Sequence, residues 1–516
     1  MVSLQTTVAL ATIGVYLAIV LALGYRGWQV GTLDVDDWMA AGRGLGIVVL
    51  LFTFAASYHS AFAFLGVGGF VYANGIGIFS ASTFYLVISG LILWIVGSRV
   101  WLLGKKHGYI TPSDLLGDFY ESPLLGKLVS LALIVFTFPY IATQLIGGGI
   151  IFETATQGAI SFEVGAALFV VAGVIYVWLG GLRAVAWTDA LQGVFMFGAM
   201  WIAGWFFVFS AYRGPQAFWT EIVREFGAYV SLLGPAGTIT PAFYISFAIM
   251  TGIGVSMTPH LFLRYVSARS PRVLKWVAAF GTGYLILFYL PTAFLGLGAV
   301  QAFPDLAQAD SAIPMVLYEF TPVWFASIVV AGAVAAAMST ADSQLHAVSA
   351  LLTRDWYEAY AAEDVDEETV TRVAQYTIPV LGVISYVIAI QQFEFILLLT
   401  ALSFYGAAQQ LPILLGALFW PRASREGALA GFSLGIAVTA VIEFGVVTLP
   451  AVLPGFVSGF YGLLVNTVVS VAISLAVGGV SEDTLEDTQG YIDYAISRGW
   501  ETGRDVTAGD VTTDDD

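Results

Sequence analysis

The stretch LFTFAASYHSAFAFLGVGG, from Leu51 to Gly69, is apolar at both ends and polar in its middle, over the run Ser57–Ser60. It is long enough to cross a bilayer, which takes about 20 apolar residues. Inside hydrocarbon, a backbone carbonyl that leaves the helical hydrogen-bond pattern must find a partner in the protein or in a ligand. A polar run within a span is therefore typical of a broken helix whose free carbonyls can hold an ion.

A second stretch, MTGIGVSMTPHLFLRY from Met250 to Tyr265, carries Gly252, Gly254 and Pro259 within one apolar run. Glycine and proline both weaken a helix, so this span is also expected to be broken. The alternative is that small residues in either stretch only allow neighbouring helices to pack closely. The two stretches occupy matching positions in a repeat of the spans, which favours the break.

The composition predicts a membrane protein. Of the 516 residues, 58% are hydrophobic and 11% are charged, and the mean hydropathy is +0.85, whereas a soluble domain carries about 25% charged residues. There is no cysteine, which excludes disulfides and thiolate chemistry, and the four histidines lack a zinc-binding spacing. Neither a P-loop nor a GxSxG motif is present. We therefore expect neither ATP-driven transport nor an enzyme, and no nucleic-acid partner.

The apolar segments predict an all-α polytopic membrane protein with about thirteen transmembrane helices. The expected spans are about 6–25, 45–73, 78–99, 123–155, 161–180, 188–212, 242–266, 273–302, 322–354, 371–391, 394–420, 426–447 and 455–478. The ten that follow the first form two sets of five. In each set the third helix begins at a proline, Pro123 or Pro322, about 80 residues after the first begins. Because five is odd, the second set enters the membrane from the opposite side, which is a 5+5 inverted repeat with its binding site near the midplane.

The basic residues predict the orientation. With the first helix starting outside, seventeen of the nineteen Lys and Arg residues, Arg264 among them, fall on the inside, and only Arg213 and Arg224 fall outside. Cytoplasmic loops carry such an excess. We therefore expect a multi-pass protein of the cell membrane, with the N-terminus outside and the C-terminus cytoplasmic.

The chain divides into five parts on this basis. They are an extra N-terminal helix (1–30), a first five-helix repeat (45–212), a second, inverted repeat (242–420), two C-terminal spans (426–478) and an acidic tail (481–516). The tail holds eleven acids and two arginines, a composition that predicts a largely disordered segment. It is too short for a folded signalling domain, and no obligate protein partner is expected.

The segment AAAMSTADSQLHAVS, from Ala335 to Ser349, places two hydroxyls and an acid in the second half of an apolar span. Together with GGLRAVAWTDALQ (Gly180–Gln192), it resembles the hallmark segments of the sodium/solute symporter family, and TPHLFLRYVSARS (Thr258–Ser270) resembles a third, weaker one. The resemblance covers about residues 5–480. It implies a LeuT-type fold, in agreement with the repeat.

The resemblance also implies a sodium site. The adjacent Ser339 and Thr340 match the hydroxyl ligands of the family, Ala336 matches a carbonyl ligand on the same helix, and Ala56 and His59 match carbonyl ligands from the broken first helix of the repeat. Sodium is a hard cation that binds oxygen, and neutral dipoles can replace its hydration shell. The alternative for Ser339 and Thr340 is a packing face whose hydroxyls bond the preceding turn.

Two acids are candidates for the ion pathway. Asp189 matches a family acid on the sodium exit path to the cytoplasm, although an acid in the first turn of a helix is also favourable on dipole grounds alone. Asp342 must face protein or water rather than lipid. It could steer the cation or simply pair with an arginine.

The residues expected to line the solute pocket lie at the two breaks and on the third helix of the first repeat. They are Ser57, Tyr58, Ser60, Phe62, Gln144, Thr251 and Val255. Proline symporters of the family carry an acid at the position of Tyr58 and aromatics at those of Thr251 and Val255, so a proline substrate is disfavoured. The imidazole of His59 either faces this pocket or is hydrogen-bonded in the core.

We therefore expect a sodium-coupled secondary active symporter that imports a small organic solute, a carboxylate such as a monocarboxylate, pantothenate or an amino acid. A transporter-like solute sensor and a proton-coupled symporter are the alternatives. The short tail argues against the sensor, and the Ser339–Thr340 pair favours sodium.

Overall fold

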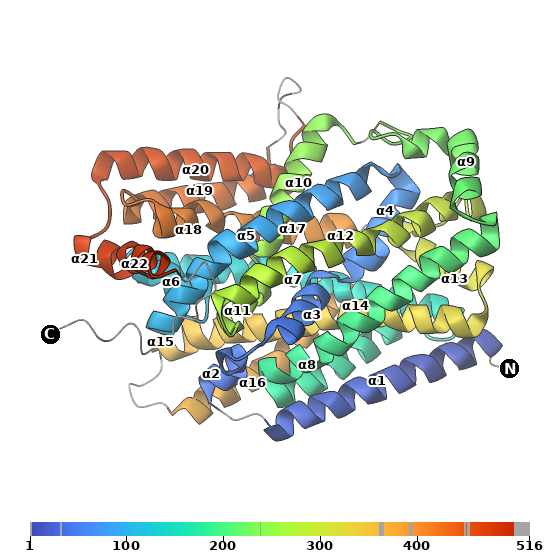
Figure 1. Cartoon of the computed structure of the whole chain (residues 1–516), viewed down its shortest axis with the longest axis horizontal. Coiled ribbons are helices and arrows are strands. Elements are labelled where there is room, and N and C mark those ends of the chain that lie inside the picture. Colours follow the sequence, from blue (N-terminus) through green and yellow to red (C-terminus); the bar gives the residue numbers. More distant parts are fainter. Residues whose placement is uncertain are drawn as a thin grey trace.

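The computed structural model describes residues 3–30, 34–237, 239–360, 366–391, 396–447, 450 and 455–499. These residues form helices and, apart from an isolated bridge between Leu45 and Ala268, no extended pairing. The long continuous helices are α1 (Leu4–Val30), α5 (Gly77–His107), α7 (Pro123–Ala155), α8 (Phe162–Tyr212), α12 (Pro271–Ala302), α14 (Val323–Leu351), α16 (Glu367–Ala389), α19 (Arg425–Glu443) and α20 (Ser458–Val477). They lie side by side in one bundle (Figure 1).

Both spans that were predicted to be broken are broken. In the first, α3 (Ile47–Tyr58) is followed by the π-helix η2 (Phe62–Gly66) and α4 (Val67–Asn74), with a bend of 57°. In the second, α10 (Pro241–Ser256) and α11 (Pro259–Ser267) are bent by 52°. A third interruption, at Gln409, separates α17 (Ile396–Ala408) from α18 (Gln410–Phe419) within one predicted span.

The described residues hold ten helices that are long and apolar enough to cross a membrane, or twelve spans if each bent pair is one span. The thirteenth predicted span corresponds to the shorter apolar helix Phe162–Trp178. That short helix and the span after it were predicted as separate segments with a gap at 181–187, but α8 runs through the gap. Its one non-helical residue is Gly181 (φ 57°, ψ −159°). A side chain there would lie 2.6 Å from the Trp38 ring, so the kink requires glycine.

Several spans begin at the polar and proline residues that usually start helices. Ser122 accepts a hydrogen bond from the amide of Leu125 while Pro123 fills the first position of α7, and Thr240 with Pro241 does the same for α10. Pro322 precedes α14. These starts confirm the expected beginnings of the third helix in each repeat.

The helices differ in how much protein surrounds them. Of the most apolar 18 residues of α14, 83% are buried, against 28% for α1 and 22% for α20. Helix α14 is therefore an inner helix covered by others, whereas α1 and α20 expose apolar side chains such as Val15, Val468 and Leu475 to the surroundings. The polar half of α14 consequently faces protein and not lipid.

Short helices cover the two ends of the bundle. At the end that carries the start of α1 lies α9 (Pro215–Phe226), and at the opposite end lie α2 (Val35–Ala40) and α6 (Pro112–Phe119), as Figure 1 shows. The remaining short elements are η1 (Ala41–Arg43), η3 (Gly227–Val230), η4 (Ala309–Ser311), α13 (Ala312–Phe320), η5 (Leu352–Tyr357) and α15 (Glu358–Tyr360).

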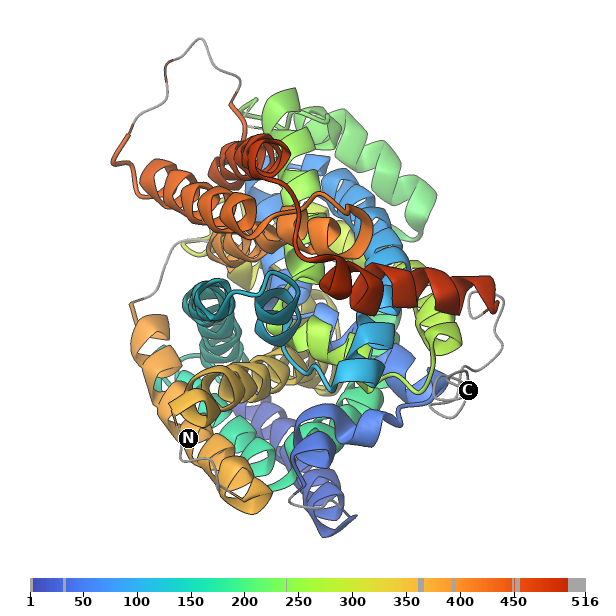
Figure 2. The same ribbon diagram turned by 90° about the vertical axis from the view of Figure 1, so that its left-hand side faces the viewer.

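The prediction that the segment from 481 onward is largely disordered is wrong for its first part. Residues up to Ser497 form α21 (Glu482–Leu485), η6 (Glu486–Gly490) and α22 (Tyr491–Ser497), which cross the α2–α6 end of the bundle (Figure 2). Asp487 pairs with Lys106 at 2.5 Å, and Gln489 donates to backbone carbonyls of α18. Ile492 and Ala495 are buried, and this docked apolar face is what orders the segment. Residues 500–516 lie outside the described residues.

Candidate functional site

The break between α3 and η2 frees backbone groups in the middle of the bundle. The helix ends at Tyr58, and His59 adopts an extended conformation (φ −83°, ψ 114°). The Ser60 hydroxyl accepts from the amide of Phe62 at 3.1 Å. The side-chain oxygen of Gln144 accepts from the amide of Ala61 at 2.9 Å. The free amides of the break are thus held by side chains, which leaves its carbonyls to be accounted for.

Those carbonyls point at α14. The Ser339 hydroxyl lies 2.8 Å from the carbonyl oxygen of Ala56 and 3.1 Å from that of Ala336. The Thr340 hydroxyl lies 3.5 Å from the carbonyl oxygen of Ala56, 3.4 Å from that of His59 and 3.3 Å from that of Ala336. All five residues predicted as sodium ligands therefore meet at one point. The carbonyl oxygen of Ser57, 3.3 Å from the Thr340 hydroxyl, joins them.

The set is rich in acceptors and poor in donors. Ser339 and Thr340 contribute one hydroxyl hydrogen each, so together they can donate to only two of the three carbonyl oxygens of the break, those of Ala56, Ser57 and His59. The carbonyl of Ala336 lies within the continuous helix α14. Each of these residues is fully buried, and an unpaired carbonyl inside a membrane is costly. Carbonyls of unwound helices are the kind of ligand that binds sodium in transporters built on inverted repeats.

The imidazole of His59 faces away from these oxygens. It lies against Phe288, with ring centroids 4.0 Å apart, and near Tyr284 and Tyr289 of α12. The ring therefore packs in an aromatic part of the core, which is one of the two alternatives expected for His59.

The predicted pocket residues at the first break adjoin a cluster of aromatic rings. Tyr58 stacks on Tyr85 at 6.5 Å, and Phe62 lies edge-on to Phe404 at 5.9 Å. Other contacts are made by residues that the sequence reasoning missed. Tyr140 donates to the Ser60 hydroxyl at 3.4 Å, and the hydroxyls of Tyr85 and Tyr289 are 2.5 Å apart. The only sequence signal for Tyr140 was its position one helical turn before Gln144.

The other predicted pocket residues differ in whether their polar groups already have hydrogen-bond partners. Gln144 also donates to the carbonyl of Tyr140 at 3.0 Å, so the oxygen of its amide holds the break while its nitrogen bonds its own helix, α7. Thr251 and Val255 are buried on α10, just before the second break, and the Thr251 hydroxyl has no hydrogen-bond partner among the described residues.

Asp189 lies in a buried ion pair that the sequence did not reveal. Its Oδ2 atom is 3.0 Å from Nη2 of Arg264, whose side chain is 1% exposed. Oδ2 also accepts from the hydroxyls of Thr53 at 2.7 Å and Ser57 at 3.1 Å. Arg264 had been assigned to a cytoplasmic loop, and that assignment is wrong. The available signal was an arginine within an apolar span, which must pair inside the protein.

Asp342 has no arginine beside it. Its carboxylate is fully buried, and neither oxygen has a hydrogen-bond partner among the described residues. A side chain at Gly173 of α8 would lie 2.7 Å from its Oδ1 atom. Asp342 therefore faces α8, protein rather than lipid, and the alternative of a nearby ion pair is not found in the described part of the chain.

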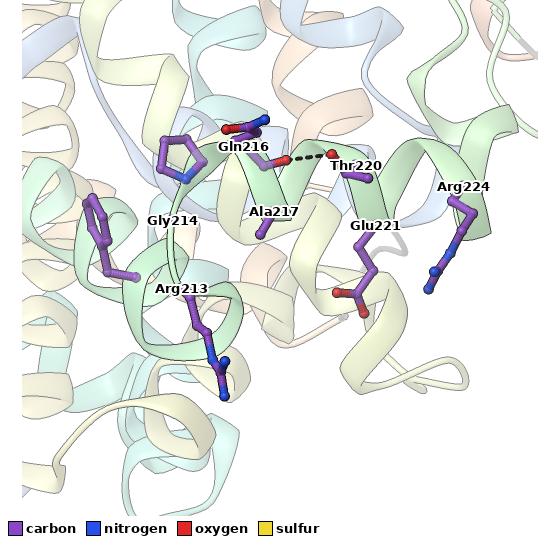
Figure 3. Close-up of a pocket in the computed structure, with 9 residues that line it drawn as sticks. Arg213, Gly214, Gln216, Ala217, Thr220, Glu221 and Arg224 are labelled. Carbon is purple, nitrogen blue, oxygen red and sulfur yellow. Dashed lines mark hydrogen bonds between the residues drawn. The ribbon is translucent and has the colours of Figure 1, made fainter.

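A surface hollow of about 720 Å³ at the turn from α8 to α9 is separate from this site. In Figure 3 the side chains of Arg213, Glu221 and Arg224 extend to the same side of that turn. Glu221 already accepts from Gln301, and Arg224 pairs with Glu225. The hollow lies at the end of the bundle and takes no residue from either broken helix.

The bent helix pairs and the oxygen set define a secondary transporter of the LeuT fold. The family model of the sodium:solute symporter family matches residues 38–435, so the chain belongs to this family, which couples solute movement to sodium. The Escherichia coli sodium/pantothenate symporter is 29% identical over 441 residues, covering 83% of this chain and 89% of that protein. The uncharacterized symporter YhjB of Bacillus subtilis is 27% identical, with 83% and 87% covered.

Solved structures share the fold. A substrate-bound, outward-open Na+-coupled sialic acid symporter superposes with a TM-score of 0.79 at 18% identity, over 92% of this chain and 99% of that one. A nucleobase-cation-symport-1 family transporter in a closed conformation gives 0.59 at 14% identity, over 88% and 97%. The predicted all-α fold with a LeuT-type inverted-repeat core is confirmed.

Proposed function

We propose that this protein imports a small organic solute together with sodium, and that the sodium ion binds between the first break and α14. The ligands would be the carbonyls of Ala56, His59 and Ala336 and the hydroxyls of Ser339 and Thr340. The observation that carries the proposal is the convergence of these buried oxygens, where only two hydroxyls face the three break carbonyls of Ala56, Ser57 and His59. None of these ligand groups is charged, so the ion can be released again during a transport cycle.

The solute is proposed to be a carboxylate, such as a monocarboxylate, pantothenate or an amino acid. Pantothenate, proline and sialic acid, the solutes in the names of relatives and of a structural neighbour, all carry a carboxyl group. The pocket residues that we predict are aromatic or hydroxyl-bearing, and none is acidic, so none repels an anion. Tyr58, whose buried ring stacks on Tyr85 beside the break, is a candidate donor to the solute.

The proposed exit path for sodium passes Asp189. Ser57 connects the two places, because its carbonyl faces Thr340 and its hydroxyl bonds Asp189. Asp342, fully buried on α14 two residues after Thr340, is the second acid proposed to act on the cation along this path. With the N-terminus outside and the C-terminus cytoplasmic in the cell membrane, the path leads toward the end of the bundle that carries α2 and α6.

The test is uptake into proteoliposomes of labelled carboxylates, amino acids and sugars, driven by an inward sodium gradient or by the same gradient of potassium. Accumulation above equilibrium only with sodium identifies the solute and supports the proposal. The matched control is Ser327→Ala, which removes another hydroxyl of α14 that bonds only its own helix and Tyr318. Saturable binding of a solute without accumulation in either cation would contradict the proposal and favour a sensor.

A further inference from the structure

Beside the proposed sodium site lies a second cluster of oxygens, and a cation of the protein already fills it. Nη2 of Arg264 lies 2.6 Å from the Ser343 hydroxyl, 2.8 Å from that of Ser57, 3.0 Å from Oδ2 of Asp189 and 3.3 Å from the Thr53 hydroxyl. One guanidinium nitrogen thus sits among four oxygens from three helices, α3, α8 and α14.

This oxygen set has the chemistry of a cation site. Three hydroxyls and one carboxylate are hard ligands, and the carboxylate gives the cluster a full negative charge. All of its members are buried. A buried charge must be paired, and a guanidinium stays protonated under all ordinary conditions. Without Arg264, the cluster would need another cation.

The two sites share structural elements. The carbonyl of Ser57 lies 3.3 Å from the Thr340 hydroxyl, while the hydroxyl of the same residue lies 2.8 Å from Nη2 of Arg264. Ser343 follows Ser339 by four residues, one helical turn along the same face of α14. A sodium ion bound between α3 and α14 would therefore lie next to the guanidinium of Arg264, along the same polar face of α14.

We propose that Arg264 is a built-in cation occupying what would otherwise be a second sodium site, and that the chain therefore binds one sodium ion per cycle. This inference rests on the proposed function. A sodium ion in the same cluster would lie within a few ångströms of the guanidinium, and like charges at that distance repel strongly where water is excluded.

Asp342 does not supply a competing second site. No hydroxyl or amide of the described residues donates to either of its oxygens, whereas three hydroxyls surround the Asp189–Arg264 pair. It offers a lone carboxylate without the neighbouring hydroxyl ligands that sodium requires.

The inference is tested by counting sodium ions on the purified full-length protein with ²²Na+, which requires no knowledge of the solute. We expect one ion per chain for the wild type and for Arg264→Lys, which keeps the charge. We expect two for Arg264→Gln, because Asp189 and the three hydroxyls then lack their cation. The double variant Arg264→Gln with Asp189→Asn should return to one.

The matched control is Arg183→Gln, which removes an arginine paired with Asp37 away from both clusters and should leave the count at one. Two ions on the wild type, or one ion on a folded Arg264→Gln variant, would overturn the inference. If the wild type binds two and Asp342→Asn removes one, the second site is at Asp342. No sodium on the wild type would overturn both the proposed function and this inference, whereas the outcomes above overturn this inference alone.

Discussion

The two broken helices bend by nearly the same angle, 57° and 52°, yet their free carbonyls meet different partners. At the second break, Tyr265 donates to the carbonyl of Ser256 at 2.7 Å, Gln410 donates to that of Met257, and Thr258 donates to that of Val255 at 2.6 Å. Three carbonyls have three donors there.

At the first break, two hydroxyls serve three carbonyl oxygens, those of Ala56, Ser57 and His59. The difference teaches that a break in a membrane helix does not by itself make an ion site. The site arises where the protein leaves acceptors that its own donors cannot satisfy.

The largest effect is expected at the first break, on removing the hydroxyls of Ser339 and Thr340. A contact between a polar group and a charge contributes about 1.5–3 kcal/mol, so Ser339→Ala with Thr340→Ala should weaken sodium activation of uptake by about 100-fold or more. Sodium titrations of uptake measure this. Unaltered sodium dependence in a folded double variant would falsify the site assignment.

Sodium should stabilise the protein through the first break alone. At about 100 times the dissociation constant, a ligand that binds only the folded state adds about 2.7 kcal/mol to the free energy of unfolding. The measurement is the thermal unfolding midpoint in sodium chloride against the same concentration of potassium chloride. The Ser339→Ala, Thr340→Ala variant should lose this shift. An equal shift in that variant would place the stabilising ion elsewhere.

A substitution at the second break should lower the stability of the protein without changing the sodium dependence of uptake. Gln410→Leu leaves the buried carbonyl of Met257 without its donor, which should cost about 1–3 kcal/mol of unfolding free energy. Thermal unfolding in potassium measures the loss, and sodium titration of uptake in the same variant should show an unchanged half-saturation. A large rise in that value would mean that both breaks bind sodium.

The smallest expected effect is that of Thr258→Val, which keeps the shape of the side chain and removes one donor at the second break. Its bond joins Thr258 to Val255 only three residues away, and a neutral hydrogen bond contributes about 0.5–1.5 kcal/mol. A small decrease in the unfolding midpoint is expected. A loss comparable to that of Gln410→Leu would indicate that Thr258 supports more than this one carbonyl.

The spans and the breaks were accessible from sequence because hydropathy and a polar run are local properties. The resemblance located the five proposed sodium ligands, which the structure brings together. Gly252 and Gly254 were taken as signs of the second break, but they lie within α10. A side chain at Gly252 would meet the backbone oxygen of Tyr85, and one at Gly254 that of Phe404. Close packing, the alternative interpretation, applies to both, while the break falls at Met257 and Thr258.

The Asp189–Arg264 pair could not be predicted from a local sequence pattern, because the two residues are 75 positions apart. They meet only because the fold brings α8 next to α11, the second half of the second bent pair. The docked helices after Ser481 were missed for a similar reason. Their acidic composition resembles that of a solvated tail, and it is the contact of Ile492 and Ala495 with the bundle that orders them.

The neutrality of the oxygen set between α3 and α14 has an electrical consequence. Carbonyls and hydroxyls carry no net charge, so an ion bound there would add a full positive charge to the membrane interior. Membrane voltage would then act on the loaded carrier, by about 2.3 kcal/mol per 100 mV for a charge that crosses the whole field, and far less on the empty one. A monoanionic solute carried with a single sodium ion would cancel that charge. The current during uptake would therefore report the charge of the cargo, with none for a monocarboxylate and an inward current for a zwitterion.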